Sequence, residues 1–158
     1  MILSPHFSRR EFTRSDIASR NGIVNEPSTE QWRIIEALCF NILEPARDRV
    51  GPIQITSGYR CPALNQLVGG ERGSDHMILL DSAAADLVIP KGMGYLFSLI
   101  YTSLPWSRLI WEYGGEWIHV SYCLSGRPGG RRPQRKLHGL PYTPMTDEEI
   151  AILIEGRP

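Results

Sequence analysis

The stretch SRLIWEYGGEWIHVSY, residues 107–122, is typical of two β-strands joined at Gly114-Gly115. β-Branched and aromatic residues run through both halves, and paired glycines between two such runs predict a tight hairpin turn. The stretch therefore predicts an antiparallel strand pair, around which the rest of a sheet can form.

The register of this hairpin decides which side chains share a face of the sheet. With a two-residue turn, Glu112 pairs with Trp117 and Ile110 pairs with His119. Glu112 and His119 then lie on one face, and Glu116 is turned away. A wider or bulged turn at the glycines would instead let Glu116 bend toward that face. An ordinary polar partner across a solvated strand pair is an equally good reading of Glu112, so the register alone leaves its role open.

Helices and further strands are expected on both sides of the hairpin. Three capping boxes mark helix starts: Ser8 with Glu11, Ser28 with Gln31, and Thr146 with Glu149. The first helix is expected to end by Asn21-Gly22. Apolar residues then recur at helical spacing from Trp32 to Ala46, which predicts the main core helix. Pro45 lacks a backbone donor and predicts a kink or restart near Leu43-Glu44.

Further strands are predicted at 53–57 and 85–90, with a short helix after Pro62 and an apolar helix at 94–104. Helices and strands do not alternate regularly, so the fold class is α+β, with a mainly antiparallel central sheet and flanking helices. The 158 residues suffice for one compact core, and we expect a single domain over 1–158.

Composition excludes several classes of protein. The 17 basic and 17 acidic residues cancel, so no overall field favours nucleic acid or an anionic membrane. No apolar stretch is long enough for a signal peptide or for a membrane span, which predicts synthesis in a cytoplasm. Cys39, Cys61 and Cys123 show no paired spacing and are expected to be reduced. The segment 125–139, rich in glycine and arginine, is expected to be a solvated loop without the aromatic residues of a single-strand binder.

Two of the four histidines lie beside predicted strands and near carboxylates. His76, Asp86 and His119 together offer the three histidine and carboxylate ligands of a catalytic zinc site. A single histidine in such a place is more often a hydrogen-bonded structural residue, and spacing alone does not decide between the two readings.

Four motifs in order along the chain favour metal ligands over structural histidines: SGYRCPALNQLVGG, SDH, AAADL and EWIHVSY. With LSPHFSRREFTRSDIASRNGIVNEP and LEPAR before them, they resemble the M15 metallopeptidases, the zinc D-Ala-D-Ala carboxypeptidase family, and most closely its short phage and bacterial members. The resemblance covers nearly the whole chain. It implies an α+β fold with zinc held on a central antiparallel sheet, and cleavage of stem peptides of the bacterial cell wall.

The resemblance also implies roles for single residues. The family's SxHxxGxAxD motif places two zinc ligands on His76 and Asp86, and the third ligand is His119. The acidic residue three positions before that last histidine, the family's general base, is Glu116. The arginine of the SGYR motif is Arg60, which would stabilise an oxyanion or bind a substrate carboxylate.

Three further expectations depend on this alignment. The interval from His76 to Asp86 is ten residues where the family has seven, so three residues within MILLDS must loop out, and Asp81 is a rival ligand. Glu112 is the rival base. Ser74 and Asn65 are expected to shape the substrate groove.

The predicted function is zinc-dependent hydrolysis of peptidoglycan stem peptides, as an endopeptidase or a DD-carboxypeptidase. We expect a monomer that needs no nucleic acid and no membrane insertion. It would act on the cell wall, as a phage lysin or a virion component. The alternative is a non-catalytic peptidoglycan-binding relative with the same fold.

Overall fold

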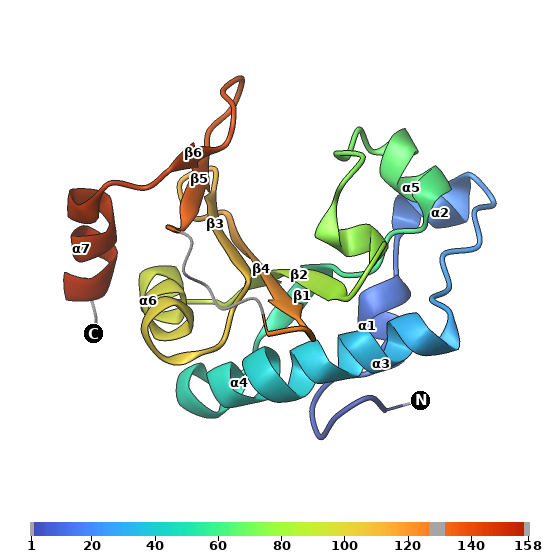
Figure 1. Ribbon diagram of the computed structural model, residues 1–158, viewed down its shortest axis with the longest axis horizontal. Helices are drawn as coiled ribbons and strands as arrows, with labels where there is room; N and C mark the ends of the chain where they lie inside the picture. The colour runs from blue at the N-terminus through green and yellow to red at the C-terminus, as the bar shows by residue number, and fades with distance from the viewer. Residues whose placement is uncertain (1, 127–131, 157–158) are drawn as a thin grey trace.

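The computed structural model describes residues 2–126 and 132–156 (Figure 1). The elements follow one another as α1 (Arg9–Thr13), α2 (Asp16–Arg20), α3 (Thr29–Leu38), η1 (Cys39–Leu43), α4 (Glu44–Val50), β1 (Gln54–Ser57), α5 (Pro62–Leu67), η2 (Asp75–Met77), β2 (Ser82–Val88), α6 (Met93–Ser103), β3 (Arg108–Glu112), β4 (Trp117–Cys123), β5 (Gln134–Lys136), β6 (Thr143–Pro144) and α7 (Asp147–Glu155). The η1 segment is a π-helical turn and η2 is a 3-10 turn. The fold is α+β, as expected.

The six strands form one sheet in the order β1-β2-β4-β3-β5-β6. Most neighbours are antiparallel, but β3 and β5 run parallel, so the sheet is mixed rather than mainly antiparallel. The reason is that β4 runs back beside β3, so β5 starts from the same end of the sheet as β3 and pairs with its other edge. Part of the segment 125–139, expected to be a loop, forms β5, and its residues 127–131 lie outside the described part of the chain.

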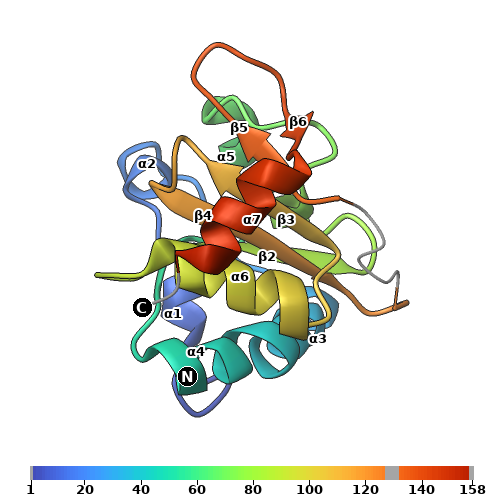
Figure 2. The same cartoon turned by 90° about the vertical axis from the view of Figure 1, so that its left-hand side faces the viewer.

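The two faces of the sheet have different chemistry, because successive side chains of a strand point to opposite sides. One face is apolar and packs on helices. Its fully buried members include Ala83, Ala85, Leu87, Leu109, Ile118 and Val120. Trp111 extends this face and meets the ring of Phe97 on α6 edge to face. Figure 1 shows α3 and α4 running beneath the sheet, and Figure 2 shows α6 against it with α7 outside α6. The opposite face is left for polar residues.

The main core helix is interrupted where Pro45 predicted it. The α-helix α3 widens into the π-turn η1, which ends at Leu43, and α4 begins at Glu44 with Pro45 in its first turn. Since proline cannot donate the backbone hydrogen bond of a continuous α-helix, the chain restarts a turn there. Of the predicted kink or restart, the structure shows the restart, and the apolar residues on both sides stay in the core.

The first helix is shorter than expected. It ends at Thr13, Arg14 is extended, and Ser15 caps a second helix by accepting a hydrogen bond from the Ala18 amide. A serine side chain competes with the helix for backbone donors and so favours a new helix start. The break places Arg14 and Ser15 at the edge of the site described below.

Two expectations from composition can be compared with the structure. All three cysteines are free, and Cys39 is completely buried in η1. Within the described residues, no helix is both long and apolar enough to cross a membrane.

The N-terminal segment is fixed to α4 by one buried carboxylate, that of Glu44. Ser4 Oγ donates to its Oε1 at 2.6 Å, the His6 amide donates to the same oxygen at 2.9 Å, and His6 Nδ1 lies 2.7 Å from Oε2. Burial alone would raise the pKa of Glu44, but the hydrogen bonds from Ser4 and His6 outweigh it and lower the pKa below its ordinary value. Its stabilising contribution is therefore fully present above the ordinary glutamate pKa and is lost as the pH falls through the lowered one.

We predict that Glu44→Gln lowers the free energy of unfolding by about 1–3 kcal/mol at pH 7, because hydrogen bonds to a charged group are lost. The difference from the wild type should shrink as the pH is lowered toward 3, where the native carboxylate also becomes protonated. Denaturant unfolding at both pH values measures this. Glu36→Gln, at an exposed position on α3, is the control. An equal loss at both pH values would show that shape rather than charge matters at Glu44.

Candidate metal centre

Three buried side chains from separate elements converge on the polar face of the sheet. They are His76 from η2, Asp86 from β2 and His119 from β4, and one possible ligand atom from each lies within 4.8 Å of the others. Asp86 and His119 are direct cross-strand partners, which fixes their distance through the backbone. The structure thus brings together all three residues expected to be ligands.

Each imidazole turns one nitrogen toward Asp86, and the second nitrogen of His76 has a close acceptor. His76 Nδ1 lies 2.6 Å from the carbonyl oxygen of Gly58, and its Nε2 lies 3.3 Å from Asp86 Oδ1. His119 Nδ1 lies 2.9 Å from the same carboxylate oxygen. The His119 Nε2 atom is buried without a hydrogen-bond partner among the described residues, and the nearest carboxylate oxygen, Asp75 Oδ2, is 3.9 Å away. Metal-binding histidines commonly have an acceptor behind the ring, as His76 has in the Gly58 carbonyl, so the donor set suits a metal ion.

The protonation of the cluster also favours a cation. Burial alone would lower the pKa of His119, but the carboxylates of Asp75 and Asp86 raise it to about 9. Burial lowers the pKa of His76. Burial would raise the pKa of Asp86, yet the two histidines beside it hold it far below the usual range. The site therefore carries a buried carboxylate that attracts positive charge, which a metal ion would supply in place of a proton.

Residues 78–81 of the MILLDS segment form a loop between η2 and β2, and Asp86 beyond it lies in the cluster of three. Ile78 adopts a left-handed conformation and is buried in the core, whereas Leu79 and Leu80 are exposed. Asp81 caps the end of β4, where its carboxylate accepts a hydrogen bond from the Ser125 amide. Asp81 is not part of the cluster of three, so the geometry favours Asp86 as the ligand.

Arg60 is bound to the cluster rather than directed only at a substrate. Its Nη2 donates to Asp86 Oδ2 at 3.2 Å, and Nε and Nη2 both donate to Ser57 Oγ. This leaves Oδ1 of Asp86 facing the two histidines. Arg60 therefore orients the carboxylate, which adds a positioning role to the one expected from the sequence.

We predict that Arg60→Ala weakens metal binding about 10- to 100-fold, the usual effect of losing a group that orients a ligand. Titration against a chelating dye measures it. Arg33→Ala removes an arginine whose ion pair lies on an exposed surface and should change nothing. Unchanged metal affinity in a folded Arg60→Ala protein would restrict Arg60 to substrate contact.

The second carboxylate at this site comes from Glu112. A cavity of about 820 Å³ contains all three candidate ligands, and Glu112 lines it together with Arg60. Glu112 pairs with Trp117 and Ile110 with His119, the register predicted from a tight hairpin. The Glu112 side chain is only 5% exposed, and burial raises the pKa of its carboxyl group.

The structure does not bring Glu116 to the metal cluster. Glu116 is exposed in the turn that joins β3 to β4, and it is not among the residues that line the cavity. Tyr113, Gly114 and Gly115 all have positive φ, and the Trp111 ring lies so close beneath Gly115 that a Cβ there would be 2.3 Å from it. The turn is thus wider than two residues, as one reading of the sequence allowed, but it points Glu116 outward.

The two expected groove residues have different surroundings. Ser74 caps η2 and lines the cavity. Asn65 is buried and donates to the Glu71 carbonyl, so it holds the loop at Gly69-Gly70 and is absent from the residues that line the cavity.

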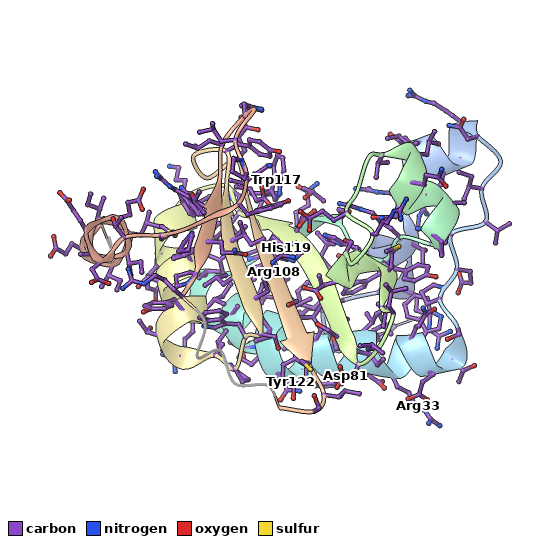
Figure 3. The ribbon with its side chains drawn as sticks, turned by 45° about the horizontal axis from the view of Figure 1, so that its top comes forward. Arg33, Asp81, Arg108, Trp117, His119 and Tyr122 are labelled. Atoms are coloured by element: carbon purple, nitrogen blue, oxygen red, sulfur yellow. The ribbon has the colours of Figure 1, made fainter. Side chains whose placement is uncertain are left out.

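Sequence reasoning missed Asp75 and Arg108, which lie beside His119. Asp75 is adjacent to His76 in the chain, and Arg108 shares a strand face with Ile110, so the register of the hairpin would have located the arginine. Figure 3 shows Arg108 and His119 next to each other in the middle of the sheet.

The site has two imidazoles and a carboxylate, from η2 and two neighbouring strands, and a second buried carboxylate in the same cavity. This arrangement is typical of a metal-dependent hydrolase. The sequence model of the Peptidase M15 family matches residues 5–121. The chain therefore belongs to the Peptidase M15 family, whose members are metal-dependent peptidases. The matched range includes every candidate ligand and Glu112. None of the curated proteins compared with the chain matches it.

Proposed function

We propose that this protein is a zinc peptidase that hydrolyses peptide bonds in the stem peptides of bacterial peptidoglycan. The observation that supports it best is the cluster of His76, Asp86 and His119, which lies beside a buried glutamate in one cavity of a Peptidase M15 chain. Two histidines and a carboxylate leave a coordination position open, as catalytic zinc sites do.

His76, Asp86 and His119 would hold the metal. When bound, zinc supplies a Lewis acid that polarises a carbonyl group and makes water more acidic. Arg60 keeps Asp86 in place from behind. Glu112, on the same face as His119, takes a proton from the attacking water and returns it to the leaving amine nitrogen. Its raised pKa, caused by burial, suits a group that must both accept and donate a proton near neutral pH.

The test is to incubate the metal-loaded protein with purified peptidoglycan and to identify released fragments by mass spectrometry. New peptide ends that depend on the metal support the proposal. Intact peptidoglycan after incubation with fully metal-loaded protein would contradict it and favour the non-catalytic wall-binding relative. Action on the wall as a phage lysin or virion component is part of the proposal, and the same assay on whole cell walls addresses it.

A further inference from the structure

The polar face of the sheet continues along the strands past the metal cluster. The cross-strand pairs form successive rows on this face: Glu112 with Trp117; Ile110 with His119 and Asp86; Arg108 with Ser121 and Ala84; and Cys123 with Ser82. The metal cluster occupies the second row. From Trp117 to Cys123 the strand spans roughly 20 Å at about 3.4 Å per residue, the length of about six residues of extended peptide.

Two cavities lie along these rows. The one described above contains Trp117, His119 and Glu112, and a second cavity of about 690 Å³ contains Ser121, Cys123 and other residues of the later rows. Both are lined by Ser74 and Arg108, so the two cavities are neighbours beside the metal cluster. In Figure 3, Trp117, His119 and Asp81 follow one another in this direction, with Arg108 beside His119.

Small side chains keep the floor low where the two cavities are neighbours. Ala84 and Ser121 are the partners in this row, and neither fills space above the sheet. Ser121 is completely buried, and the Asp75 carboxylate lies beside its hydroxyl group. Both residues line the second cavity.

The inserted loop forms an apolar wall of the second cavity. Leu79 and Leu80 both line it, and they are 59% and 77% exposed. Two adjacent leucines left exposed beside a concave site are more typical of ligand contact than of a solvated loop. Arg108 lines both cavities and is held by a hydrogen bond from its Nε to Gln134 Oε1.

The geometry points to an endopeptidase whose substrate lies extended through both cavities. The scissile bond lies over the metal cluster, at least two residues are bound on each side of it, and an apolar side chain contacts Leu79 and Leu80. The inference rests on the proposed peptidase function. It adds that the enzyme cuts internal bonds, because an enzyme that removes a terminal residue needs room for several residues on one side of the cluster only.

Gly73 offers a way to fill the second cavity alone. It lines that cavity but not the first, no described atom lies within 4 Å of the position of an added Cβ, and its φ is not left-handed. Gly73→Tyr should therefore fold normally and obstruct the second cavity, and Gly73→Ala is the matched control.

The test uses three synthetic peptides that share one cleavable bond. One peptide extends two or more residues on both sides of this bond. Each of the other two is shortened to one residue on one side.

Gly73→Tyr should lower kcat/KM for the long peptide about tenfold or more, equivalent to about 1.4 kcal/mol. The kcat/KM for the shortened peptide that does not reach the second cavity should be unchanged. The Gly73→Ala variant should behave as the wild type with all three peptides. Leu80→Ser should weaken the preference for an apolar residue at the position that reaches it.

Equal cleavage of the long peptide by wild type and Gly73→Tyr, or equal losses with all three peptides, would overturn the inference. Release of single terminal residues only by the wild type would do the same. Failure of the metal-loaded wild type to cleave any peptide contradicts the proposed function instead. Calorimetric binding of the long peptide then tests the groove: Gly73→Tyr should bind it about tenfold more weakly than Gly73→Ala, and equal binding would overturn the two-cavity groove.

Discussion

Glu112→Gln should lower the rate of peptide hydrolysis by a factor of about 10² to 10⁴, the usual cost of losing a positioned general base. Glutamine keeps the size and shape of the side chain but cannot accept a proton. Because Glu112 is not part of the cluster of three, the variant should bind as much metal as the wild type. Steady-state cleavage of a wall peptide, with metal analysis of the same samples, measures both quantities.

Glu116→Gln is the matched control, since it makes the same change four residues along the chain, on an exposed turn. It should retain nearly full activity. An inactive Glu116→Gln protein beside an active Glu112→Gln protein would show that the base follows the family alignment, and that the turn closes over the site when substrate binds.

The second large effect concerns the metal. Asp86→Asn should reduce the metal content from about one ion per chain to a small fraction, because a neutral amide is a poor ligand and the two imidazoles lose the negative charge between them. Elemental analysis after dialysis measures it. The variant should also lose the ion pair with Arg60, so its unfolding should be followed in parallel to separate loss of metal from loss of fold.

Asp81→Asn is the control within the inserted loop. The Asp81 carboxylate accepts a hydrogen bond from the Ser125 amide just after β4. The Asp81→Asn variant should therefore keep its metal. Greater loss of metal in Asp81→Asn than in Asp86→Asn would mean that the loop rearranges around the ion. His119→Ala and the exposed His138→Ala form a second matched pair, of which only the first should lose metal.

Local sequence signals predicted much of the fold because they act over a few residues. The capping boxes at Ser8, Ser28 and Thr146 are present as predicted, and the break at Pro45 appears as a π-turn. The strand β5 was not predicted. It has three polar residues in a segment rich in glycine and arginine, and only pairing with β3 and β6 makes it a strand.

The candidate site was predicted in part for the same reason. His76, Asp86 and His119 follow from motifs, and their convergence is set by one antiparallel strand pair. The choice between Glu112 and Glu116 depends on how Trp111 packs under Gly115, a contact that no local pattern encodes. The second cavity depends on side-chain sizes in three strands at once, so the sequence alone gave no sign of it.

The inserted loop is anchored at both ends. Gln31 Nε2 on α3 donates to the carbonyl oxygens of Met77 and Ile78, and the Asp81 carbonyl accepts from the Leu124 amide. His76 and Asp86 are fixed outside these anchors by η2 and β2. The tip can therefore change in length and composition without moving a candidate metal ligand. In evolutionary terms, selectivity and chemistry are separable in this molecule, and the loop tip is the natural position at which to graft a new preference onto an unchanged catalytic centre.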